Sequence, residues 1–131
     1  MTSNIRYAVV TAILFFVSSG WATNSDLITM EREIVIQKPL MEVYVVAADA
    51  INDHLWRDEV NEITANGPFM LGTIYYEDAK LGSNDNFITQ TEITYIASNE
   101  VIYETIAENP SYLKSQRIFT ALNPNETLFT Y

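Results

Sequence analysis

The sequence predicts an α+β domain in which one strand and two short helices precede about six antiparallel strands. Two patterns lead to this prediction. Apolar residues recur at helical spacing near residue 40, whereas short segments rich in β-branched and aromatic residues follow from residue 60 onward. Glycine, proline, asparagine and serine separate those later segments at short intervals. With 131 residues, 48% of them hydrophobic and 18% charged, the chain suits a single globular domain.

The first 22 residues differ in composition from the rest. Arg6 is their only basic residue, an apolar run spans residues 8–17, and small residues lead up to Ala22. This pattern predicts a secretory signal peptide over residues 1–22 with cleavage after Ala22. The run is shorter than the ~20 apolar residues of a membrane-spanning helix, although an uncleaved anchor is the alternative. We therefore expect a secreted or periplasmic product with no stable membrane anchor after cleavage.

The domain that follows, predicted over residues 29–131, opens with a strand. Glu31, Glu33 and Val35 alternate with residues that include Ile34 and Ile36, so one face of this strand is expected to be buried. The strand should stop at the proline that comes three residues after Ile36, at position 39. The isoleucines are predicted to point inward.

Two helical segments are predicted next. Pro39 is compatible with the first turn of a helix, where its missing N–H costs little. An apolar stripe follows at spacing i, i+3, i+4 and i+7, made by Leu40, Val43, Tyr44 and Ala47. The pattern of residues 50–56 predicts a second short helix, and the pattern of residues 60–65 predicts a strand.

The remaining chain is expected to be an antiparallel meander. Turn residues punctuate it at 67–72, 82–86, 98–99 and 109–111. Loops this short favour antiparallel neighbours, because parallel strands need a crossover of about a dozen residues or more. In the segment 87–96, alternation predicts that one face carries Phe87, Thr89, Thr91, Ile93 and Tyr95.

Several short motifs occur in a fixed order along residues 29–131. They are Ile34-x-Ile36-x-x-Pro39-x-x-x-Val43-Tyr44, Asp49, Trp56-x-x-x-Val60, Gly67-Pro68-x-x-x-Gly72, Glu92-Ile93-Thr94 and Leu122-x-Pro124 with Thr127. In order and spacing they resemble the polyketide cyclase/dehydrase and lipid-transfer group of the START/Bet v 1-like (SRPBCC) superfamily. One departure is Glu126, since the family turn usually has glycine before this threonine.

This resemblance implies a helix-grip fold, in which a curved antiparallel sheet wraps around a long C-terminal helix and encloses an apolar cavity. In such proteins the strand corresponding to residues 127–131 is followed by that long helix, and this sequence has none. We therefore expect a C-terminally incomplete domain, a truncated product or a short variant. The inner face of its sheet should stay exposed to water, with self-association through the uncovered sheet as a possible consequence.

Composition excludes several classes of function. Seven basic and seventeen acidic residues give a net charge of -10, which repels phosphates, so no nucleic-acid partner is expected. Cysteine is absent, which excludes thiol catalysis and zinc-thiolate sites. His54 is the only histidine and is interpreted as a solvated surface residue, with a general base as the alternative. The pairs Asp58-Glu59 and Glu77-Asp78 are interpreted as solvated as well. No catalytic residue, metal site or cofactor is predicted.

The aromatic residues carry the functional prediction. Eight of them are candidates for the wall of an apolar cavity: Tyr44, Trp56, Phe69, Tyr75, Tyr76, Tyr95, Tyr103 and Phe119. The alternative is that they form an ordinary core, which we favour for Tyr44. The predicted ligand-binding residues are Trp56, Tyr75, Ile93, Tyr95, Tyr103 and Phe119.

Three classes of function follow from these patterns. The leading one is an exported binding or carrier protein whose partner is a hydrophobic small molecule, either a lipid or an aromatic, polyketide-like compound. The second is a cyclase or dehydratase that transfers protons through inward Tyr, Glu or Asp side chains. The third is a protein interaction module whose apolar sheet docks a helix of a partner. Binding leads because the sequence shows an aromatic set and no convergent titratable groups.

Overall fold

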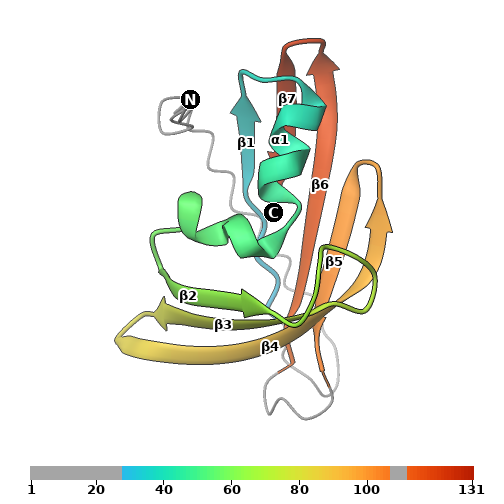
Figure 1. The fold of residues 1–131 in the computed structure, drawn as a ribbon. Coiled ribbons are helices and arrows are strands. Elements are labelled where there is room, and N and C mark those ends of the chain that lie inside the picture. The colour runs from blue at the N-terminus through green and yellow to red at the C-terminus, as the bar shows by residue number, and fades with distance from the viewer. Residues whose placement is uncertain (1–27, 107–111) are drawn as a thin grey trace, which may run out of the picture.

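The computed structural model describes residues 28–106 and 112–131. They form one curved seven-stranded sheet with two short helical segments packed on its inner side (Figure 1). The elements are β1 (Glu33–Ile36), α1 (Leu40–Ala47), the 3-10 helix η1 (Ala50–Leu55), β2 (Val60–Ala65), β3 (Ile74–Leu81), β4 (Asn84–Ala97), β5 (Glu100–Thr105), β6 (Lys114–Asn123) and β7 (Glu126–Thr130). The predicted signal peptide at 1–22 and the predicted turn at 109–111 lie outside the described residues.

The strand order confirms the predicted α+β class and the antiparallel meander. Strands β2 to β7 pair with their neighbours in chain order, and β1 joins the sheet beside β7, which gives the order β1-β7-β6-β5-β4-β3-β2. Every pairing is antiparallel. Six strands follow the helical segments, as predicted.

The two helical segments occupy the predicted positions. Pro39 precedes α1, and Val43 and Ala47 of the predicted stripe are buried against the sheet. The second segment is a 3-10 helix whose first turn is capped by Asp49, because the Asp49 carboxylate accepts a hydrogen bond of 3.1 Å from the N–H of Ile51. Six residues is a long run for this tighter helix, which is mostly used in shorter pieces.

The predicted inner face of β1 is confirmed by its register. Ile34 pairs with Phe129 and Ile36 pairs with Thr127 on β7, and both β7 residues are buried. Ile34 still keeps part of its surface exposed, because β1 is an edge strand with a neighbour on one side only.

A bulge in β4 corrects one prediction about facing. Ile93 pairs with Tyr103, but Tyr95 pairs with Ile102, so two steps along β4 correspond to one step along β5. The extra residue reverses the alternation of side chains from that point. Ile93 is therefore fully buried on the inner face, whereas Tyr95 is 45% exposed on the outer face. The prediction that these two residues share a face is wrong.

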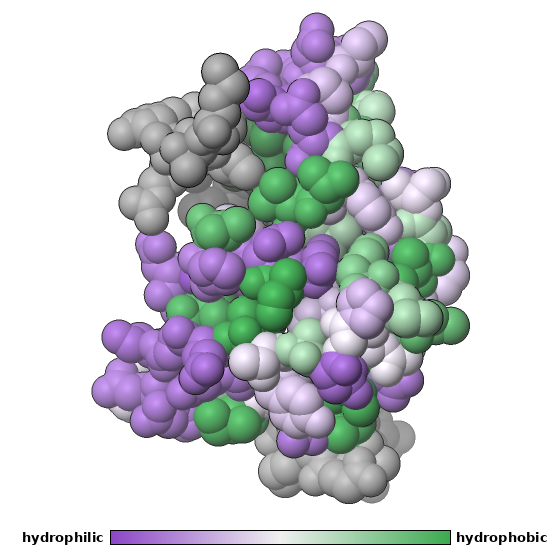
Figure 2. Space-filling model, in the orientation of Figure 1, coloured by the Kyte–Doolittle hydropathy of each residue, from purple (hydrophilic) through white to green (hydrophobic). Residues whose placement is uncertain are grey.

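The inner face of the sheet is covered, which contradicts the expectation that it would stay exposed to water. Six of its apolar side chains are buried, namely Tyr75, Ile93, Val101, Tyr103, Phe119 and Phe129, whereas Ile34 on the edge strand stays 38% exposed. The covering segments carry small buried residues, Ala47, Ala48 and Ala50, so their backbone lies close to the sheet. Figure 2 shows apolar side chains over α1 on this side, with polar residues above them, across η1 and toward β3 and β4. Within the described ranges, no helix has the length and apolar character needed to cross a membrane.

Candidate functional site

Most of the predicted ligand-binding residues lie together on the inner face of the sheet. Tyr75, Ile93, Tyr103 and Phe119 belong to one buried cluster, although they come from four different strands. Trp56 is half-buried and packs against the same cluster. Tyr95 is separated from them by the thickness of the sheet.

Trp56 lies at the end of η1 and faces β7. Its ring packs edge-on against two other rings, with centroids 5.6 Å from Phe129 and 5.7 Å from Tyr131. Edge-to-face packing of this kind adds about 0.5–1.5 kcal/mol to the burial of the ring itself. The indole therefore forms a side wall of the aromatic cluster.

A buried ion pair between η1 and β6 is the main feature that sequence reasoning missed. Asp53 is 0% exposed and Arg117 is 3% exposed. Arg117 Nη1 donates to Asp53 Oδ1 at 2.8 Å, and Arg117 Nη2 donates to Asp53 Oδ2 at 2.6 Å. Nη1 also donates to the backbone carbonyl of Ala47 at 2.8 Å. The pair ties η1 to β6 on the inner face of the sheet.

The burial of Arg117 follows from the alternation of side chains along β6, and this alternation is the sequence signal that could have revealed it. Ser115, Arg117 and Phe119 lie on one face of β6, and Phe119 is fully buried, so period-two alternation places Arg117 inward. Burial by itself lowers the pKa of Arg117, but the charge and hydrogen bonds of Asp53 outweigh burial and raise this pKa above its ordinary value.

A second arginine extends the ion pair toward β3. Arg57 Nη1 donates to Asp53 Oδ2 at 2.9 Å and to Glu77 Oε2 at 3.0 Å, and Nη2 donates to Glu77 Oε1 at 3.1 Å. Its Nε donates to Glu59 at 2.9 Å. The interpretation of Glu77 as a solvated residue is therefore wrong, because its side chain is mostly buried and paired. Asp78 points to the opposite face, as adjacent strand residues do.

Two tyrosine hydroxyls tie the same helical segment to the sheet. Tyr103 donates to the carbonyl of Ala48 at 2.6 Å and accepts from the N–H of Ala50 at 3.0 Å. Tyr75 donates to Asp49 Oδ1 at 2.7 Å. Burial raises the pKa of both tyrosines above the ordinary value of about 10, so both stay protonated donors at neutral pH.

Aromatic rings surround the guanidinium of Arg117. Its central carbon lies 4.8 Å from the ring centroid of Tyr103, 5.5 Å from that of Tyr131 and 5.6 Å from that of Trp56. Contacts this short are favourable between a cation and a ring face. The inner face thus combines an apolar aromatic wall with one compact charged cluster.

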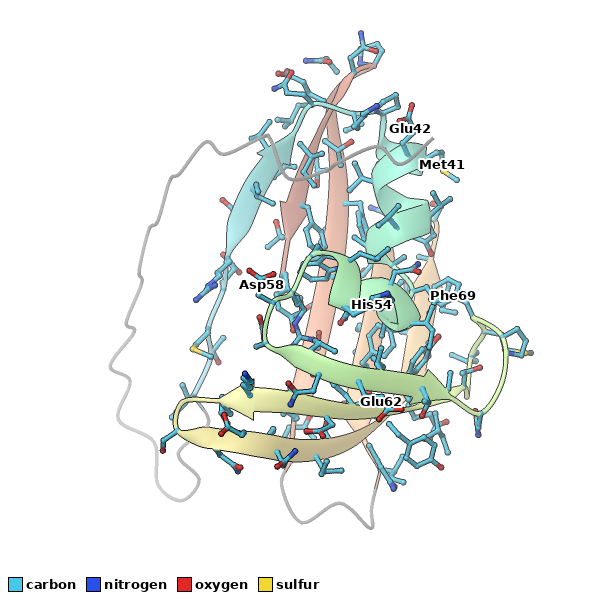
Figure 3. The ribbon with its side chains drawn as sticks, turned by 60° about the vertical axis from the view of Figure 1, so that its left-hand side comes forward. Met41, Glu42, His54, Asp58, Glu62 and Phe69 are labelled. Atoms are coloured by element: carbon cyan, nitrogen blue, oxygen red, sulfur yellow. The ribbon has the colours of Figure 1, made fainter. Side chains whose placement is uncertain are left out.

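The sequence interpretation of His54 agrees with its position. It is exposed on the outer side of η1 (Figure 3), where Nδ1 lies 3.0 Å from the carbonyl of Ile51. In the part of the chain that the structure describes, no group of three or more His, Cys, Asp or Glu residues is placed to hold a metal ion.

The fold itself matches solved structures. An aromatase/cyclase, Zhui, from Streptomyces sp. R1128 is similar with a TM-score of 0.67 and 10% identity over 77% of this chain and 62% of that protein. A START superfamily protein from Mycobacterium smegmatis is similar with a TM-score of 0.66 and 11% identity, over 77% of this chain and 71% of that one. The di-domain ARO/CYC BexL from the BE-7585A biosynthetic pathway is similar with a TM-score of 0.60 and 11% identity, over 77% and 34% of the two chains.

These similarities define the class of fold. The curved antiparallel sheet with short helices on its inner side is the helix-grip fold of START/Bet v 1-like proteins, as the sequence motifs predicted. At this level of identity the likeness shows the fold alone, and one fold hosts many functions. Neither a protein-family model nor a curated relative matches the sequence.

Proposed function

We propose that this chain is an exported binding or carrier protein for a hydrophobic small molecule, a lipid or an aromatic, polyketide-like compound. One observation supports this proposal above the others. Aromatic residues from several strands converge on the inner face of a START/Bet v 1-like sheet, around a single charged cluster. Binding sites for apolar molecules are usually walled in this way, with a few polar groups that fix orientation.

Binding can be followed through Trp56, which is the only tryptophan once residues 1–22 are removed. Titration with an aromatic ketone probe should change its emission saturably, because its ring borders the aromatic cluster. Tyr95→Ala serves as a matched control, since it removes an aromatic ring from the outer face and should leave the titration unchanged. If no apolar probe alters the emission of the folded protein, the binding proposal fails.

Export is the second part of the proposal, and it rests on the composition of residues 1–22. Cleavage after Ala22 would release a secreted or periplasmic protein without a stable membrane anchor. Sequencing the N-terminus of the protein from its host tests this. A soluble product that still begins at Met1 or Thr2 would rule out the signal peptide.

An enzyme on the same scaffold is the alternative, because two of the similar structures are named as aromatase/cyclase proteins. The inner face offers Asp53, Tyr75 and Tyr103 for proton transfer. However, Asp53 is held by two arginines, and the raised pKa values of the tyrosines make them poor acids at neutral pH. Mass spectrometry of a linear polyketone incubated with the protein would detect turnover as loss of water.

Two partner predictions remain to be tested. A protein interaction module would need an open apolar sheet, and six apolar side chains of the inner face are buried instead. Self-association stays a prediction, which size-exclusion chromatography at several protein concentrations would test. A single elution volume at the monomer size would oppose it.

A further inference from the structure

Three polar atoms on the inner face are buried without a hydrogen-bond partner among the described residues: Trp56 Nε1, Ser115 Oγ and Arg117 Nε. They belong to one neighbourhood. Ser115 and Arg117 alternate on the same face of β6, and the guanidinium of Arg117 lies 5.6 Å from the ring centroid of Trp56.

All three of these atoms can donate a hydrogen bond, and two of them cannot accept one. The indole N–H and the guanidinium N–H can only donate, and the serine hydroxyl can donate or accept. A buried donor without an acceptor is unfavourable, so most buried donors in native proteins are paired. A group that would satisfy this neighbourhood must therefore bring a hydrogen-bond acceptor.

The surrounding charges restrict what that acceptor can be. Arg57 and Arg117 are already compensated by Asp53 and Glu77, and Glu59 adds a further carboxylate beside Arg57. An incoming anion would meet no free positive charge here, and burial of an uncompensated charge is strongly unfavourable. A neutral acceptor meets no such penalty.

We propose that the inner face selects apolar molecules that carry a neutral carbonyl oxygen, with the indole N–H of Trp56 as the selecting donor and Arg117 Nε beside it. This inference rests on the proposed binding function and names its ligand class. The three atoms are out of reach of solvent, and the half-buried rings of Trp56 and Tyr131 lie beside Arg117.

A series of three molecules with equal carbon number tests the selection: methyl nonyl ketone, undecane and undecanoate. Their affinities for the purified protein are measured by displacement of a bound fluorescent apolar probe. The ketone should bind about tenfold more tightly than undecane, as expected for one added hydrogen bond in a buried site. Undecanoate should bind more weakly than the ketone.

Trp56→Phe removes the N–H and keeps an aromatic ring, so it should abolish the preference for the ketone while undecane still binds. Tyr95→Phe removes a hydroxyl on the outer face and should keep the preference. A measurement that needs no variant supports the same point: in isotope-labelled protein, the indole N–H signal of Trp56 should shift downfield with the ketone and not with undecane.

The outcomes separate the two proposals. If none of the three molecules displaces the probe, the binding function itself fails. If ketone and undecane bind equally, the carbonyl inference fails while binding survives. If undecanoate binds most tightly, or if the preference for the ketone survives in Trp56→Phe, the assignment is also overturned.

Discussion

Replacing Arg117 by Met should destabilise the domain severely. The variant leaves the fully buried Asp53 without two hydrogen bonds, of 2.8 and 2.6 Å, and leaves the carbonyl of Ala47 without one. Asp53 keeps its bond of 2.9 Å to Arg57, so its charge is only half compensated. Methionine fills a similar volume, which separates the loss of charge from the loss of packing.

The magnitude follows from burial. Breaking one partner of a buried ion pair costs about 3–5 kcal/mol, against the ~5–15 kcal/mol that stabilises a typical domain. For a domain of this size such a loss lowers the melting temperature by roughly 10–20 °C. The matched control is Lys38→Met, which breaks the surface pair with Glu42, whose side chains are 44% and 58% exposed. That change should cost about 1 kcal/mol or less.

Urea titrations and thermal melts of both variants measure the difference. A double variant, Asp53→Leu with Arg117→Met, should be more stable than Arg117→Met alone, because it removes the buried carboxylate that Arg117→Met leaves only partly compensated. If Arg117→Met melts within a few degrees of Lys38→Met, Asp53 and Arg117 do not form a buried pair and the description of the site is wrong.

Three further predictions test other parts of the fold. Val43→Asp places a charge on the buried face of α1 and should cost several kcal/mol of stability. Glu42→Ala, on the exposed face, should cost under about 1 kcal/mol. Equal melting temperatures of the two variants would contradict the assigned faces. The free energy of unfolding should fall as pH rises above about 10, because the raised pKa of Tyr103 keeps its hydroxyl neutral in the folded state while the same hydroxyl ionises in the unfolded chain. Tyr103→Phe should flatten this fall. The same variant should lower stability at neutral pH, because it removes two hydrogen bonds. Phe119→Ala empties a fully buried site and should cost about 3–5 kcal/mol of stability. Tyr95→Ala, on the outer face, should lower the melting temperature less than Phe119→Ala does. The reverse order would place Tyr95 on the inner face of the sheet.

The spacing of apolar residues in the sequence was sufficient to predict the helices and strands and, for most of them, which face is buried. The apolar spacing of α1 and the turn residues between strands are local signals, and both predicted the observed structure. The facing of Tyr95 could not be found in this way, because the bulge depends on how β4 pairs with β5 and alternation within β4 hides it.

The charged cluster was missed for a related reason. Asp53 and Arg117 are 64 residues apart, and neither has a local pattern that names its partner. A charged residue at an inward strand position is a usable signal, because such a residue is almost never fully buried unless paired. Applied to β6, that rule would have predicted a carboxylate facing Arg117, although not which one. The covering of the inner face also needed the structure, since it depends on how closely Ala47, Ala48 and Ala50 approach the sheet.

The position of β1 beside β7 has a consequence for the order in which the chain folds. Strands β2 to β7 can form as successive local hairpins, but Glu33 pairs with Thr130, 97 residues further along the chain. Arg32 and Tyr131 extend this pairing with reciprocal backbone hydrogen bonds of 2.7 and 2.9 Å. Closing so long a loop costs more entropy than closing a local hairpin, although this cost grows only slowly with loop length. Wherever the chain folds, β1 therefore stays without its partner until β7 is available, so the first of the described strands is among the last to join the sheet.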